Sequence, residues 1–191
     1  EVKKVKNKKL LVGAAIGTNQ EDLDRARLLI SNGVDLIVID TAHGHSKKVL
    51  QTLLKIKKIT KNTPVCVGNI ATREAAKKLY DSGADIIKVG IGPGSICTTR
   101  MVAGIGVPQI SAIMEVKEAL NKKNIKIISD GGIKFSGDIA KALAAGADAI
   151  MMGSIFAGTD ESPGKKYKIN GKFYKKYRGM GSIGAMSAGS A

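Results

Sequence analysis

The sequence has few aromatic residues and few cysteines. Aromatic residues make up 4% of its 191 residues and none is tryptophan, so the stacked aromatic platform on which single-stranded nucleic acids bind is not expected. Cys66 and Cys97 are the two cysteines. This number argues against a disulfide scaffold and fits a reducing, cytoplasmic location. Neither cysteine has a histidine at the spacing of a structural zinc site.

Long hydrophobic runs are also missing. No apolar stretch reaches the roughly 18 residues that a membrane span needs, and residues 1–6 lack the apolar segment of a signal peptide. We therefore expect no membrane association. The hydrophobic content of 43% excludes a disordered chain. The length is sufficient for one substantial core.

Acidic residues are in the minority, with 16 against 31 basic ones, which gives a net charge of +15. Only 5 of the basic residues are arginine, and the lysines are spread over predicted helix faces. This distribution favours a solvated surface that attracts anionic metabolites over a specific nucleic-acid interface. A non-catalytic nucleotide- or nucleic-acid-binding protein remains an alternative.

Short β-branched runs alternate with amphipathic segments along most of the chain. The expected strands are 10–16, 36–40, 65–69, 86–90, 125–129 and 149–153. The expected helices are 20–31, 46–60, 72–81, 111–121 and 136–145, with Thr72 and Ser136 as N-caps. Most of the strands are continuously apolar, as in a parallel sheet buried on both faces.

A Gly-x-Asp repeat supports this pattern. It occurs at 33–35, 83–85 and 146–148, each time between a predicted helix and the next strand. Glycine suits the left-handed position that ends a helix. The repeat therefore marks tandem βα units, which build either a barrel or a doubly wound sheet.

Two features favour an α/β fold of the (β/α)8 TIM-barrel class, with about six of the eight βα units present. Polar and glycine-rich clusters follow the strands, where barrel enzymes place their active sites. The Gly-x-Gly-x-x-Gly signature of a Rossmann fold is absent after the first strand. An open six-stranded sheet fits the strand count equally well. We expect a barrel core over 1–156 and a C-terminal excursion over 157–191, with a hairpin turn at Asn170-Gly171.

The loop Gly92–Arg100 carries the clearest chemical signal. It follows an apolar strand and holds Gly92, Pro93 and Gly94 directly before Ser95, a composition typical of a tight turn whose backbone groups face a ligand. The loop presents Cys97 as a candidate nucleophile. Cys66 lies within an apolar strand and is expected to be a core residue.

Taken together, these loops resemble the inosine-5′-monophosphate (IMP) dehydrogenase family over essentially the whole chain. The resemblance rests on segments in a fixed order: 13–17, 40–44, 68–69, 92–100, 130–132, 152–154 and 177–182. It implies a barrel whose first two strands precede Glu1 and an arginine–tyrosine flap beyond Ala191. It also implies a homotetramer.

The resemblance also implies a role for each loop. Cys97 would add to C2 of the hypoxanthine ring, hydride would pass to NAD, and Thr99 would help position the water that releases xanthosine monophosphate. Substrate contacts are implied for Ser95, Asp130, Gly131, Gly132, Gly153, Ser154, Tyr177, Gly179, Met180 and Gly181. NAD contacts are implied for Asp40, Thr41, Asn69, Gly90 and Gly92. The carbonyls of Gly92, Gly94 and Cys97 would form half of a potassium site.

The nearest alternative activity is that of guanosine monophosphate (GMP) reductase, which shares the barrel, the cysteine and the phosphate loops. The segments 101–109 and 178–182 resemble the dehydrogenase more closely. The sequence therefore favours oxidation of IMP with NAD over reduction of GMP with NADPH.

Overall fold

The computed structural model describes residues 10–179 and 182–187. Its main feature is a parallel sheet of six strands that lie in chain order from β1 to β6. The strands are β1 (Gly13–Ile16), β2 (Leu36–Asp40), β3 (Val65–Ile70), β4 (Ile86–Val89), β5 (Lys126–Asp130) and β6 (Ala149–Met151). The strand order does not reverse, as it would in a doubly wound sheet. The six strands form a half-barrel, which confirms the predicted α/β class and partial TIM barrel.

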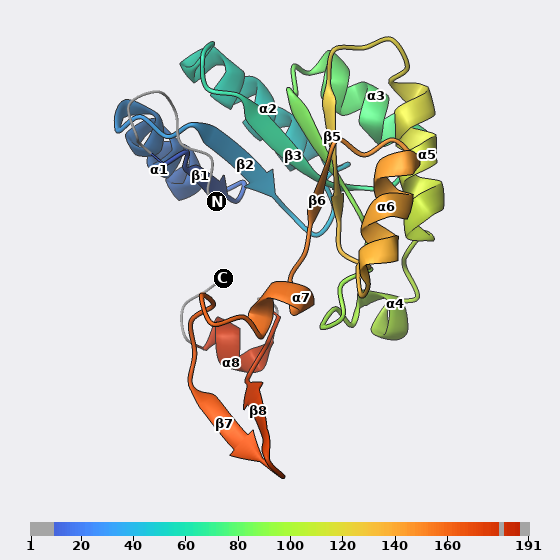
Figure 1. Ribbon diagram of the computed structural model, residues 1–191. Coiled ribbons are helices and arrows are strands. Elements are labelled where there is room, and N and C mark those ends of the chain that lie inside the picture. Colours follow the sequence, from blue (N-terminus) through green and yellow to red (C-terminus); the bar gives the residue numbers. More distant parts are fainter. Residues whose placement is uncertain (1–9, 180–181, 188–191) are drawn as a thin grey trace.

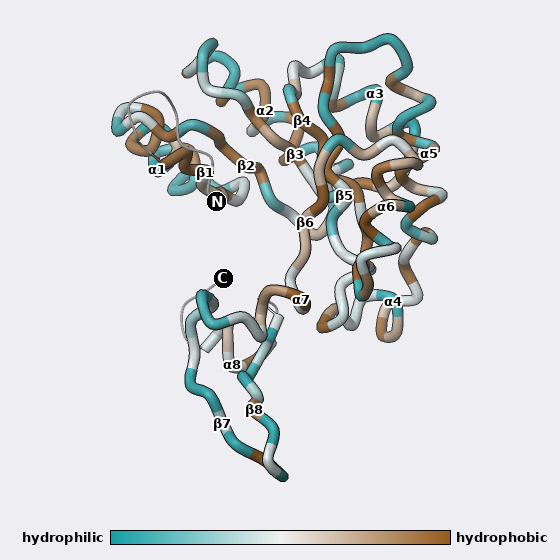
Figure 2. Tube along the Cα trace, in the orientation of Figure 1, coloured by the Kyte–Doolittle hydropathy of each residue, from teal (hydrophilic) through white to brown (hydrophobic). Residues whose placement is uncertain are grey.

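Five helices connect these strands and cover one side of the sheet (Figure 1). They are α1 (Gln20–Ser31), α2 (Lys47–Ile59), α3 (Arg73–Asp81), α5 (Gln109–Ala119) and α6 (Ser136–Ala144). Alternate strand residues such as Ile37, Ile39 and Ile87 are fully buried, in one cluster with helix residues such as Leu53. Figure 2 shows this hydrophobic concentration along the strands. The core therefore lies between sheet and helices, and Asp40 and Lys88 alternate with these residues on the other face of the sheet.

The chain beyond β6 contains short elements set apart from the sheet (Figure 1). These are α7 (Ser154–Ala157), an antiparallel hairpin of β7 (Lys166–Ile169) and β8 (Lys172–Lys175), and α8 (Ile183–Met186). The hairpin turns at Asn170-Gly171, both with positive φ, as its sequence predicts. Figure 2 shows the hairpin as mostly hydrophilic. The predicted domain boundary at residue 156 falls within α7 and stays a prediction.

Several predicted boundaries were wrong by a few residues. β1 begins at Gly13 instead of Leu10, and β6 ends at Met151. The helix predicted at 111–121 starts at Gln109, because Pro108 initiates it. Thr72 caps α3 as predicted. Ser136 does not cap α6; the Asp138 carboxylate accepts the N–H groups at that end instead. The short α4 (Thr99–Val102) was also missed.

The Gly-x-Asp repeat fastens neighbouring strands at their N-terminal edge. The carboxylates of Asp35, Asp85 and Asp148 accept the backbone N–H groups of Val12, Val65 and Ile127. In return, the backbone N–H of each aspartate donates to the carbonyl of the residue whose N–H its carboxylate accepts. The preceding glycines have positive φ in all three copies. Each repeat therefore ends a helix and ties the next strand to its neighbour.

We expect Asp148→Ala to lower the free energy of unfolding by about 1–2 kcal/mol. Burial alone would raise the pKa of the Asp148 carboxyl, but hydrogen bonds from Ile127 and Lys126 outweigh it and lower the pKa. A lowered native pKa stabilises the fold above the ordinary value of 3.8, and this stabilisation is lost as the pH falls through the native pKa. When thermal unfolding is measured at several pH values, Asp148→Ala should therefore lose less stability at acid pH than the wild-type protein.

Asp81→Ala is the matched control for this prediction. Asp81 is exposed and has no ion pair among the residues that the structure describes. Its replacement should leave both the midpoint of thermal unfolding and its dependence on acid pH unchanged. Equal losses in the two variants would contradict a specific role for the repeat.

No helix in the described ranges is both long and apolar enough to cross a membrane.

Candidate functional site

A cavity of about 430 Å³ opens at the carboxyl ends of strands β2 to β5. Its walls come from the ends of these strands and the loop after β4. The lining residues are Asp40, Thr41, Ala42, Asn69, Lys88, Gly90, Ile91, Gly92, Pro93, Gly94, Cys97, Thr99 and Asp130. Parallel barrels place their active sites at this edge. The structure therefore brings both predicted catalytic residues and all five predicted cofactor-binding residues to one cavity.

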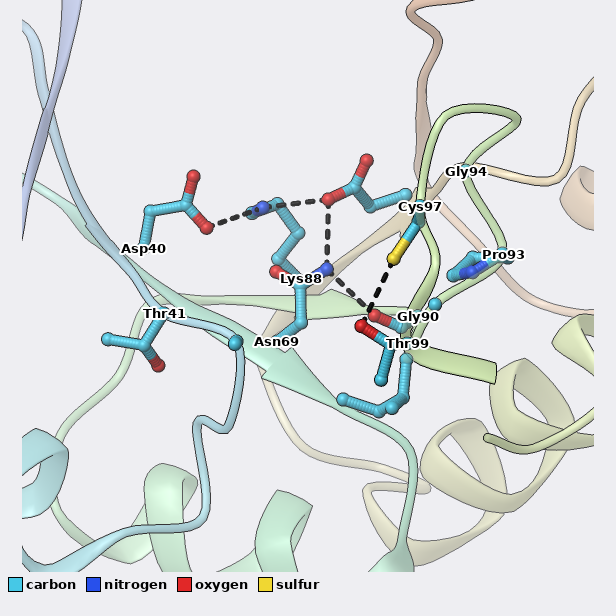
Figure 3. A pocket seen from close by; sticks show the side chains of 13 residues that line it. Asp40, Thr41, Asn69, Lys88, Gly90, Pro93, Gly94, Cys97 and Thr99 are labelled. Carbon is cyan, nitrogen blue, oxygen red and sulfur yellow. Dashed lines mark hydrogen bonds and ion pairs between the residues drawn. The ribbon is translucent and has the colours of Figure 1, made fainter. Parts of the chain in front are cut away.

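The loop after β4 presents Cys97 to this cavity. Its exposed thiol donates a hydrogen bond to Thr99 Oγ1 at 3.2 Å (Figure 3). The turn is closed by the backbone N–H of Cys97, which donates to the Gly94 carbonyl at 3.0 Å. Arg100 donates to the carbonyls of Ile91 and Val107 and so ties the start of the loop to the segment that follows α4. The structure thus assigns Arg100 a structural contact.

The two cysteines lie in opposite environments. Cys66 is fully buried in β3, and its burial raises the pKa of the thiol to about 12. A thiol with that pKa is neutral and a poor nucleophile at physiological pH. This confirms the prediction that Cys66 belongs to the core and leaves exposed Cys97 as the reactive candidate.

A chain of charged and polar groups crosses the floor of the cavity. The Lys88 ammonium lies 2.9 Å from Asp40 Oδ1 and 2.7 Å from Asp130 Oδ2 (Figure 3). Asn69 donates to the same Asp130 oxygen at 2.9 Å and to the Gly90 carbonyl. Burial alone would lower the pKa of Lys88, but hydrogen bonds and charge interactions with Asp130 and Asp40 outweigh it and raise the pKa. Lys88 is therefore positively charged at physiological pH.

A second, smaller pocket adjoins the first. It measures about 30 Å³ and shares Pro93 and Gly94 with the large cavity. It is lined by Pro93, Gly94, Ser95, Gly132, Ile133, Lys134, Gly153, Ser154 and Tyr177. Five of these are among the predicted substrate-binding residues: Ser95, Gly132, Gly153, Ser154 and Tyr177. The structure thus gathers residues from four separate segments, which follow β4, β5, β6 and β8, at one place.

Glycine is required where these loops touch. Gly131 and Gly132 both have positive φ, and a Cβ on Gly131 would lie 3.0 Å from the ring of Pro93. At Gly153 a Cβ would overlap the Tyr177 hydroxyl. Close contact between backbone segments leaves their N–H groups available to a ligand.

Two predicted site residues make contacts within the chain, and two others are not described. Thr41 lies on the β2 side of the cavity, and its hydroxyl donates to the Gly68 carbonyl. Gly179 lies beside Ile96, next to the cysteine loop. Met180 and Gly181 lie outside the described residues. Their predicted contacts with the base therefore stay predictions.

Sequence reasoning missed Lys88, Gln109 and Lys134. Lys88 is a cation in the middle of an apolar strand, which was the available signal. Gln109 donates hydrogen bonds to the Val89 carbonyl and to Ser129 Oγ. No local motif in the sequence predicted these two contacts. Lys134 follows the Asp130–Gly132 turn and lines the small pocket. The predicted substrate contacts two to four positions earlier were the available signal.

Comparisons with known proteins agree with the resemblance seen in the sequence. Residues 1–191 match the family model "IMP dehydrogenase / GMP reductase domain". The IMP dehydrogenase of Aquifex aeolicus is 59% identical over 180 residues, 94% of this chain and 37% of the relative. That of Cryptosporidium parvum is 59% identical over 182 residues, 95% of this chain and 45% of the relative.

Among solved structures, GMP reductase from Trypanosoma brucei in complex with guanosine 5′-monophosphate superposes with a TM-score of 0.90 at 44% identity. The match covers 95% of this chain and 38% of that protein. The chain thus spans roughly two fifths of the length of these relatives. On its loops, its half-barrel and the match over its full length, the chain belongs to the IMP dehydrogenase / GMP reductase family.

Proposed function

We propose that the protein containing this chain oxidises IMP to xanthosine monophosphate with NAD, a step of guanine nucleotide biosynthesis. The observation that carries the proposal is that one loop borders two pockets. It presents Cys97 to the large cavity and Ser95 to the small one. The 59% identity to the IMP dehydrogenases of Aquifex aeolicus and Cryptosporidium parvum exceeds the 44% identity to the GMP reductase structure. A nucleotide would place its base near the thiol and its phosphate in the small pocket.

The small pocket would hold the substrate phosphate. Hydroxyls of Ser95, Ser154 and Tyr177 and the backbone N–H groups at Gly132 and Gly153 are suitable donors for a phosphate dianion. The present volume of about 30 Å³ is about that of one water molecule. The pocket would therefore widen when a phosphate binds.

The ribose and base would extend from this pocket toward the thiol. The Asp130 carboxylate is an acceptor with two oxygens, which suits two adjacent ribose hydroxyls. Gly131 continues the same turn. Gly179, Met180 and Gly181 would meet the base from the other side, and Gly179 already lies next to Ile96 in the cysteine loop.

Cys97 would act as the nucleophile. The thiol loses its proton, and the thiolate forms a bond from sulfur to C2 of the purine. The carbon–hydrogen bond at C2 then breaks with its electron pair, which leaves a covalent thioimidate on Cys97. Water adds at C2, the carbon–sulfur bond breaks, and the thiol is restored as xanthosine monophosphate leaves. Thr99, hydrogen-bonded to the sulfur, would position that water.

NAD would accept the hydride that leaves C2. The residues present suit a dinucleotide: Asp40 is a half-exposed carboxylate at the rim of the cavity, able to bind ribose hydroxyls. Asn69 Oδ1 is buried without a partner among the described residues, so it is available to accept a ligand's N–H or O–H group. Thr41, Gly90 and Gly92 complete this side of the cavity.

A potassium ion would be held by the carbonyls of Gly92, Gly94 and Cys97. Backbone oxygens are the ligands that hard cations take. The Gly94 carbonyl accepts the Cys97 N–H and retains a second lone pair for the ion. The ion would stabilise the loop that carries the nucleophile. The protein would work as a homotetramer in the cytoplasm.

An absorbance assay tests the proposal. The intact protein should form NADH from NAD in the presence of IMP, and inosine, which lacks the phosphate, should be a far poorer substrate. Consumption of NADPH with GMP would instead identify a GMP reductase. Absence of either reaction, together with strongly salt-dependent binding of RNA or DNA, would favour a binding protein.

A further inference from the structure

One ammonium group serves both carboxylates of the large cavity. Lys88 Nζ is 2.9 Å from Asp40 Oδ1 and 2.7 Å from Asp130 Oδ2, and the Lys88 side chain is 4% exposed. Under the proposed function these carboxylates hold different molecules: Asp40 contacts the dinucleotide and Asp130 contacts the nucleotide. The same buried cation therefore balances the charge of two binding groups.

The strand register builds this arrangement. Asp40 on β2 is paired with Gly68 on β3, and Gly68 is paired with Lys88 on β4. The three residues thus form one row across the sheet. A Cβ on Gly68 would lie 2.6 Å from Lys88 Cβ. Because the middle residue of the row is glycine, the Lys88 side chain can cross β3 and reach Asp40.

The two carboxylates differ in their other contacts. Asp130 also accepts a hydrogen bond from Asn69 at 2.9 Å and has a side chain 23% exposed. Asp40 has Lys88 as its ion-pair partner in the described residues and is 49% exposed. Water therefore stabilises the negative charge of Asp40 better than that of Asp130. The more buried Asp130 carboxylate depends more on its ion pair with Lys88.

We propose that Lys88 is a positioning residue that couples nucleotide binding at Asp130 to the charge state of Asp40. The inference rests on the proposed function. When Asp40 is charged, Lys88 is shared and Asp130 keeps its strength as an acceptor for ribose hydroxyls. When Asp40 is neutral, Lys88 pairs with Asp130 alone, which weakens that acceptor. Asp40, which does not touch the nucleotide, would thus control the affinity of the protein for it.

The test is equilibrium binding of IMP to the intact protein without NAD, measured by calorimetry. We expect Asp40→Asn to raise the Kd of IMP about threefold. Lys88→Met should raise it about tenfold, because Asp130 then loses the ion pair that holds its carboxylate in position. In the Lys88→Met background, Asp40→Asn should no longer weaken binding. Lys88→Arg should retain the Asp40 effect, since a guanidinium also bridges two carboxylates.

Lys126→Met is the matched control. Lys126 lies on neighbouring β5, 66% exposed, and pairs with Asp148 at the opposite edge of the sheet. This variant should leave the Kd of IMP unchanged. If Asp40→Asn left the Kd unchanged in the wild-type background, or raised it equally in the Lys88→Met background, the inference would be wrong. Failure of the wild-type protein to bind IMP would instead reject the proposed function. Thermal unfolding of each variant checks that it folds.

Discussion

Cys97→Ala should abolish the formation of NADH from IMP and NAD in the intact protein, with a loss in kcat of at least about three orders of magnitude. The reason is that no covalent bond to C2 can form without the sulfur. Cys97 is exposed at the cavity, so alanine leaves no buried gap and should not alter the fold. The equilibrium affinity for IMP should stay within a few-fold of wild type.

Cys66→Ala is the matched control, because it removes the other cysteine. Cys66 is fully buried in β3, so alanine leaves a small cavity that costs about 1 kcal/mol, yet turnover should persist. Alkylation gives an independent check: IMP should protect Cys97 from iodoacetamide in wild-type protein. Turnover that survives in Cys97→Ala would reject the nucleophile.

Gly90→Ala should be the most disruptive single-methyl change, lowering the free energy of unfolding by about 3 kcal/mol or more. Gly90 is buried at the end of β4 with φ +146°, a conformation that L side chains rarely adopt. An added Cβ would overlap the Asp130 carbonyl oxygen and lie 3.2 Å from the Gln109 amide. The Asp130 carbonyl belongs to the backbone and cannot move aside as the end of a side chain can. An added methyl group would therefore push β4 and β5 apart.

This separation would displace Asp130 and the cysteine loop together. Gly90→Ala should therefore lose turnover even at temperatures where it remains folded. Gly137→Ala provides the control, since that glycine lies in α6 with nothing within 4 Å of an added Cβ. It should stabilise the protein by up to about 1 kcal/mol. A thermal midpoint for Gly90→Ala equal to wild type would contradict the overlap.

The sequence predicted the fold well where the signal was local. Each helix-to-strand junction carries its own glycine and aspartate, and α1 has the predicted bounds. The loop 92–100 could be assigned to the site because glycine, proline and cysteine occur within a few residues. The helix α6 begins at Ser136 as predicted, but the predicted cap was wrong, because the Asp138 carboxylate accepts the N–H groups of Lys134 and Phe135 just before the helix.

The charge chain of the site could not be predicted from local patterns. Lys88 is a charged residue within an apolar strand. Its role depends on ion pairs with Asp40, 48 positions earlier, and Asp130, 42 positions later. Only the strand register brings these three together. Gln109 was missed for the same reason, since its partners Val89 and Ser129 lie on two other elements.

The aspartate contacts at the N-terminal edge of the sheet also make the half-barrel modular. They join β1 to β2, β3 to β4 and β5 to β6, so that the sheet consists of three two-stranded units of similar design. The junctions between units are made by backbone bonds, such as that from Ile37 to the Pro64 carbonyl. Because these contacts lie at the N-terminal edge, they secure the sheet without using any residue of the cavity at the opposite edge.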